Sequence, residues 1–85
     1  MSFECPCCGN LTLPKDANDC VAYICPVCYW EIDTFIESEY EPSDQNNGIT
    51  LIEAKNNYKK FGACTESMLK NVRKPYKDET PKNKE

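Results

Sequence analysis

The chain has 85 residues and a formal net charge of −4. This length restricts it to one domain with a modest hydrophobic core, and no apolar run approaches the roughly 18 residues of a membrane span. The sequence contains no histidine, which excludes every metal site built on imidazole nitrogen.

The first residues, Met1-Ser2-Phe3-Glu4, lack the basic and apolar regions of a secretory leader. We therefore expect a cytoplasmic, reducing location. Seven cysteines would suit a disulfide framework in a secreted protein, but an odd number argues against complete pairing. A domain this small needs another staple, and a structural zinc ion contributes ~10 to 16 kcal/mol of apparent binding energy.

Two Cys-x-x-Cys pairs supply the candidate ligands. Cys5 and Cys8 lie in the segment Cys-Pro-Cys-Cys-Gly, and Cys25 and Cys28 lie in Cys-Pro-Val-Cys. Two such pairs on a hairpin present four thiolates to one tetrahedral ion, so we predict a structural zinc site. A closed site of this kind has no open position for water or substrate, and we expect no enzymatic activity.

Iron is the alternative metal, as in rubredoxin, because a tetrahedron of four sulfurs suits both ions. Gly9 follows the first pair and suits the positive φ of such a turn. Tyr29 follows the second pair, so the two turns are expected to differ. The missing glycine favours zinc over iron.

Short strands are expected on both sides of each cysteine turn. Residues 3–4 and 10–13 flank the first turn, and residues 20–24 and 29–33 flank the second. This order predicts a small α+β metal-bound domain, a rubredoxin-like zinc ribbon of antiparallel strands with one packed helix. Trp30 is the best candidate for a core residue beside the metal.

A polar loop is expected over residues 34–47, running across the surface. A helix should follow from the capping box of Thr50 and Glu53 to about Phe61, with Gly62 as its C-terminal cap. Residues 51, 54, 58 and 61 form its apolar stripe. One more short helical turn is expected over residues 65–70. The domain should span residues 1–76, and residues 77–85 are too polar to order themselves and should form a disordered tail.

The remaining cysteines are Cys7, Cys20 and Cys64. Cys7 lies inside the first turn and should point away from the ion, which makes it the candidate for a reactive thiol. Cys20 and Cys64 are expected to be small buried apolar residues, with a place near the metal as the alternative for Cys64.

Five segments together resemble the small bacterial cysteine-rich CPCC family, over roughly residues 3 to 79. They are residues 5–9, 24–31, 47–58, 61–64 and 72–75. The resemblance implies a small metal-binding protein and specifies neither a partner nor a cellular process.

Charge distribution bears on the partner. Residues 1–53 carry ten carboxylates and one lysine, whereas residues 54–85 carry nine basic and four acidic groups. We expect these halves to pair within the molecule and the protein to act as a zinc-dependent module that binds another protein, through the loop over residues 34–44 or the exposed helix face. One alternative is a nucleic-acid-binding ribbon. The other is a thiol redox or rubredoxin-like electron-transfer protein.

The basic residues that would touch nucleic acid in the first alternative share the C-terminal half of the chain. They are Lys55, Lys59, Lys60, Lys70, Arg73, Lys74 and Lys77.

Overall fold

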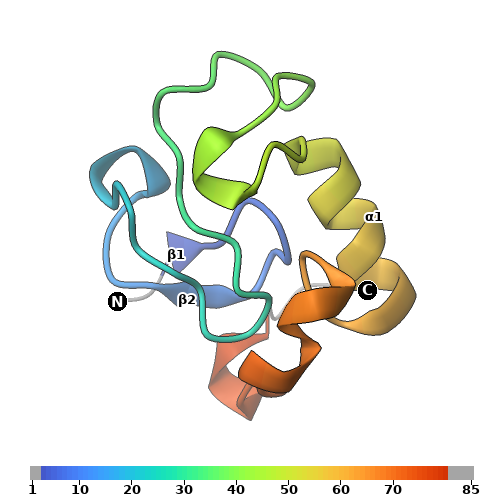
Figure 1. Ribbon diagram of the computed structural model, residues 1–85. Coiled ribbons are helices and arrows are strands. Elements are labelled where there is room, and N and C mark those ends of the chain that lie inside the picture. The colour runs from blue at the N-terminus through green and yellow to red at the C-terminus, as the bar shows by residue number, and fades with distance from the viewer. Residues whose placement is uncertain (1–2, 81–85) are drawn as a thin grey trace.

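The computed structural model describes residues 3–80 and has a small, compact α+β architecture. Its regular elements are the strands β1 (Phe3–Glu4) and β2 (Leu11–Leu13) and the helix α1 (Leu51–Phe61). Figure 1 shows the two strands near the centre, α1 along one edge, and the long loop before α1 opposite the C-terminal segments. None of the helices within residues 3–80 combines the length and apolar character needed to cross a bilayer.

The β1–β2 hairpin carries the first cysteine turn, as predicted. The strands are antiparallel, with Phe3 opposite Leu13 and Glu4 opposite Leu11, and the register shifts between the two pairs. Leu13 is almost fully buried, whereas Phe3 at the outer end is exposed. The hairpin therefore anchors one end of the turn in the core.

The second hairpin is less regular than the sequence predicts. The strand expected over residues 20–24 does not form, because Ala22 adopts a left-handed conformation with φ of 66°. Pairing is kept at single points: Ile24 and Glu31 form an isolated bridge, and the Ile32 N–H donates to the Tyr23 carbonyl at 2.8 Å. Residues 29–33 likewise form no continuous strand.

The loop before α1 is attached by two buried polar residues, which its composition did not reveal. Asn46 accepts a hydrogen bond from the Glu31 N–H at 2.8 Å and donates to the Glu31 carbonyl at 2.9 Å. Ser43 is fully buried and donates to Asp33 at 2.6 Å. These side chains thus supply hydrogen-bond partners to the extended segment around Glu31 and Asp33, where a neighbouring strand would otherwise supply them.

Helix α1 has the predicted boundaries. The Thr50 hydroxyl accepts from the Glu53 N–H at 3.1 Å, and the Glu53 carboxylate accepts from the Thr50 N–H at 3.0 Å, which completes the capping box. Gly62 ends the helix with φ of 97°. Ala54 is fully buried, and Leu51 and Tyr58 pack against the core around the cysteines.

Between α1 and residue 80 the chain forms two short 3-10 helices, η3 (Glu66–Asn71) and η4 (Lys77–Glu79). The first corresponds to the predicted turn over residues 65–70. The second falls in the segment assigned to the tail, and there Arg73 forms a two-pronged ion pair with Glu79, at 2.9 and 3.0 Å. The rest of the predicted tail, residues 81–85, lies outside the described residues.

The core is built around sulfur. Trp30 is 1% exposed, as predicted for a core residue, and it is surrounded by buried cysteines together with Val27 and Ile32. Few large aliphatic side chains are buried beside these cysteines, so hydrophobic burial alone gives a domain of this size only modest stability.

Candidate metal centre

The first cysteine turn is closed by two backbone hydrogen bonds. The Gly9 N–H donates to the Cys5 carbonyl at 2.8 Å, and the Cys5 N–H donates to the Asn10 carbonyl at 2.9 Å. Gly9 has φ of 78°, a conformation that glycine adopts without steric cost. The chain therefore reverses immediately after Cys8 and leads into β2.

The second turn repeats this geometry. The Tyr29 N–H donates to the Cys25 carbonyl at 2.8 Å, the Cys25 N–H donates to the Trp30 carbonyl at 3.0 Å, and Tyr29 has φ of 68°. The prediction that the two turns differ is wrong, because Tyr29 takes the left-handed position that Gly9 takes in the first. The missing glycine therefore does not discriminate between zinc and iron.

The two turns bring four sulfur atoms together. The Sγ atoms of Cys5, Cys8, Cys25 and Cys28 all lie within 4.8 Å of one another. Cys5 and Cys28 are separated by 3.6 Å, and Cys8 and Cys25 by 3.8 Å. A tetrahedral zinc ion with bonds of about 2.3 Å would hold its sulfurs about 3.8 Å apart, whereas a disulfide requires about 2.05 Å.

All seven cysteines are free thiols. The spacing and identity of the four clustered donors therefore fit a single ion, and the cluster could hold a metal. The spacing does not identify which metal that is.

The clustered thiols differ in the direction in which their pKa values are shifted. Hydrogen bonds from Cys28, Cys5 and Cys8, with a smaller one from Thr12, hold the pKa of Cys25 far below its ordinary value. The contact with Cys25 in turn raises the pKa of Cys28. Buried thiols this close cannot all ionise without a cation between them, so loading a metal would release protons.

Thr12 is a site residue that the cysteine motifs do not reveal. Its hydroxyl oxygen lies 3.1 Å from the Cys25 sulfur. The alternation of side chains along β2 could have indicated it, because Leu11 and Leu13 share one face of the strand and Thr12 lies on the other. A hydroxyl that donates to a thiolate orients the ligand and stabilises its charge.

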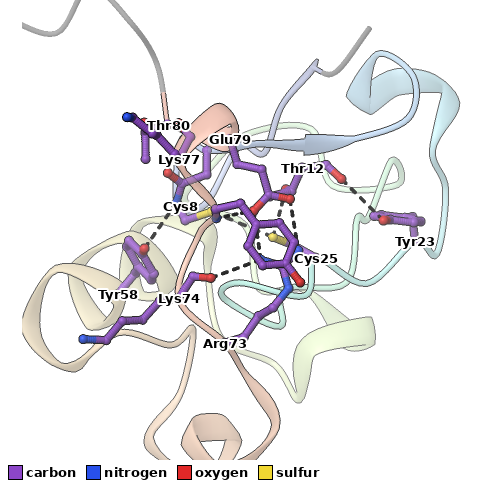
Figure 2. A network of polar contacts seen from close by, with 12 residues as sticks. Cys8, Thr12, Tyr23, Cys25, Tyr58, Arg73, Lys74, Lys77, Glu79 and Thr80 are labelled. Atoms are coloured by element: carbon purple, nitrogen blue, oxygen red, sulfur yellow. Dashed lines mark hydrogen bonds and ion pairs between the residues drawn. The ribbon is translucent and has the colours of Figure 1, made fainter.

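The C-terminal half of the chain holds the second turn in place. The Cys64 N–H donates to the Cys28 carbonyl at 2.8 Å, and the Arg73 N–H donates to the Pro26 carbonyl at 3.2 Å. Figure 2 shows Arg73 and Glu79, which form an ion pair, in one view with Cys8 and Cys25. The turn is therefore fixed by residues 36 to 47 positions further along the sequence.

The remaining cysteines lie outside the four-sulfur group. Cys7, predicted to be the reactive thiol, is only 6% exposed. Cys20 is buried, and its thiol donates to the Lys15 carbonyl at 3.3 Å. Cys64 is buried next to the second turn, and burial raises its pKa to about 11. Limited solvent access argues against high reactivity at any of the three.

Internal charge pairing is seen between the halves of the chain. Lys55 on α1 contacts Glu39 in the acidic loop at 2.9 Å, which is the kind of intramolecular pair that the charge distribution predicts. Both groups are more than a third exposed, so the pair contributes little to stability.

Comparison with known proteins agrees with the arrangement of motifs. A family model described as Cysteine-rich CPCC matches residues 3–79. No curated protein and no solved structure matches the chain.

Proposed function

This chain belongs to the cysteine-rich CPCC family, and we propose that it is a non-enzymatic protein-interaction module whose fold is held together by a structural zinc ion. The ligands in this proposal are Cys5, Cys8, Cys25 and Cys28. The observation that best supports this proposal is that their four sulfur atoms all lie within 4.8 Å of one another.

A bound zinc ion would cross-link the two turns and offset the negative charge of the thiolates. The turns belong to different hairpins, so this link joins two separate segments of the chain. Structural zinc sites contribute folding energy directly. The small aliphatic content of the core supports this role, because hydrophobic burial alone leaves a domain of this size marginal.

A zinc-ribbon classification is supported by the repeated turn geometry. Each turn closes with the same pair of backbone hydrogen bonds, and each is followed by antiparallel pairing of the flanking chain. The second hairpin departs from a ribbon at Ala22. We therefore propose a ribbon-like site with one irregular arm.

The non-enzymatic part of the proposal follows from ligand number. With four sulfurs around one ion, no coordination position is left for a substrate or an activated water. The cytoplasm is the location that suits it, because reducing conditions keep thiols available for metal.

Affinity capture from the source cells tests the proposal. Tagged wild-type protein is compared with a Cys5→Ser/Cys28→Ser double variant, which cannot complete the site. We expect a defined protein partner that copurifies with the wild type and not with the variant. Recovery of nucleic acid alone, or thiol-disulfide turnover in an insulin-reduction assay, would replace the proposal with one of its alternatives.

A further inference from the structure

A cleft of about 830 Å³ opens beside the cysteine cluster. One wall is α1, another is formed by Leu69 and residues 72–75, and Cys7, Cys8 and Val27 from the two turns contribute to the lining. Figure 2 shows Tyr58, Lys74 and Cys8, which come from these different parts of the cleft. Part of the cleft surface thus belongs to the two turns that carry the proposed metal ligands.

The charged residues that line the cleft are all basic. They are Lys55, Lys59, Arg73 and Lys74, and no carboxylate belongs to the lining. Lys55 pairs with Glu39 and Arg73 with Glu79. Lys59 and Lys74 have no ion-pair partner within residues 3–80, and they project from separate walls.

Large apolar side chains share this lining with the cations. Leu69 is 40% exposed, and Phe61 and Val72 are half-buried in the same lining. An occupant that matches the cleft therefore needs both negative charge and a bulky apolar group.

These features favour an acidic peptide over nucleic acid. A phosphate backbone that passed through the cleft would continue over a molecule with net charge −4 and ten carboxylates in its first 53 residues. That field would repel an extended polyanion. A short peptide segment would place its charges only where the cations are.

We propose that the cleft binds an acidic segment of a partner protein. The carboxylates of the segment pair with Lys59 and Lys74, and one large apolar side chain packs against Phe61 and Leu69. The inference builds on the proposed interaction function and gives it a location and a partner chemistry. A single short segment buries less surface than the ~1,200 to 2,000 Å² of a stable protein–protein interface, so the binding should be weak and reversible.

Selection from a random twelve-residue peptide library on the zinc-loaded full-length protein provides the test. We expect enriched sequences to combine several acidic residues with a Phe, Trp or Leu. An enriched peptide is then synthesised with a fluorophore and titrated by anisotropy. Failure of the library to enrich any sequence, or enrichment of basic or neutral sequences, would overturn the inference.

Charge-reversal variants then locate the binding site. Lys59→Glu and Lys74→Glu should each weaken peptide binding at least tenfold. Lys60→Glu is the matched control, because Lys60 is the next residue of the same helix, is also exposed, and lies outside the cleft lining. It should change affinity less than twofold. Equal effects of Lys59→Glu and Lys60→Glu would contradict a site in the cleft.

Other occupants are separate outcomes of the same variants. Binding of a 20-nucleotide single strand that Lys59→Glu abolishes, without peptide binding, would assign the cleft to nucleic acid. Concentration-dependent self-association in sedimentation that Lys59→Glu abolishes would assign it to a second copy of the chain. Either result would overturn the peptide inference.

Metal dependence separates the two proposals. If zinc-loaded, folded protein binds no peptide, the cleft inference fails and the structural zinc site stands. If chelated protein binds the peptide as tightly as the zinc-loaded form, the structural role of zinc in interaction fails and the cleft stands.

Discussion

Gly9 and Tyr29 occupy equivalent positions in the two cysteine turns. Their φ angles are 78° and 68°, and each donates its N–H to the carbonyl of the first cysteine of its pair at 2.8 Å. Both turns need a left-handed backbone conformation at this position. Gly9 adopts it without steric cost, whereas Tyr29 adopts it although it carries a bulky aromatic side chain. The turns are therefore interchangeable in backbone shape although their sequences differ.

Gly9→Ala should destabilise the protein through backbone strain alone. A methyl group at this position would meet no atom within 4 Å, but an L-residue at φ of 78° costs about 1 to 2 kcal/mol. Gly48→Ala is the control, since Gly48 has φ of 83° and equally open surroundings away from the cluster. Denaturant unfolding should show a similar loss for both.

Metal affinity separates these two glycine variants. Competition with a chromogenic chelator should show a larger loss of metal affinity for Gly9→Ala than for Gly48→Ala, because only Gly9 lies in a turn that carries the ligands. Equal metal affinities in the two variants would mean that the position after Cys8 does not shape the site.

Thr12→Val should weaken metal binding about tenfold, as the loss of a group that orients a ligand typically does. The Thr12 hydroxyl lies 3.1 Å from the Cys25 sulfur and helps to hold the pKa of that thiol low. Without it, protons compete better for the sulfur, so the pH of half-maximal metal binding should rise. Thr12→Ser keeps the hydroxyl and should bind like the wild type in the same pH-dependent competition assay. A Ser variant as weak as the Val variant would assign the effect to packing.

Helix α1 and the four-sulfur site could be predicted from sequence because their signals are local. Thr50 and Glu53 are three positions apart, and Gly62 follows the last helical residue directly. Each Cys-x-x-Cys turn likewise forms within six residues. Patterns of this range do not depend on distant parts of the fold.

The irregular arm could not be predicted in this way. Val21, Tyr23 and Ile24 favour a strand by intrinsic preference, yet Val21 and Ile24 are 53% and 40% exposed and Ala22 turns the chain. Tertiary context overrides β-propensity readily. The contact of Arg73 with the second cysteine turn could not be predicted either. It is a hydrogen bond from the backbone N–H to the Pro26 carbonyl, and the residue type does not indicate such a bond.

Asn46→Ala should cost about 2 kcal/mol, because it leaves the Glu31 N–H and carbonyl without their buried partner. Asn46 is 7% exposed and makes two hydrogen bonds to this one residue. Asp44→Ala is the control in the same turn, because Asp44 is exposed and surface changes of that kind stay within about 0.5 kcal/mol. Urea unfolding of both variants measures the difference. Equal stabilities would show that the loop is not attached through Asn46.

Metal removal should unfold the core of the protein and not only leave the metal site without its ion. Cys7, Cys20 and Cys64 are each 6% exposed or less, and iodoacetamide should modify them slowly in the loaded protein at neutral pH. After chelation under reducing conditions, all seven thiols should react quickly, and Trp30 emission should shift to longer wavelength as the side chain meets water. Retention of slow labelling and of the Trp30 spectrum after complete chelation would show that the fold stands without metal.

Native mass spectrometry of protein purified without added metal tests the central claim most directly. The account predicts one zinc ion per chain on a fully reduced polypeptide, and loss of that ion in Cys25→Ser. A chain that carries no metal, carries iron, or has a mass reduced by two hydrogens for each disulfide would contradict it.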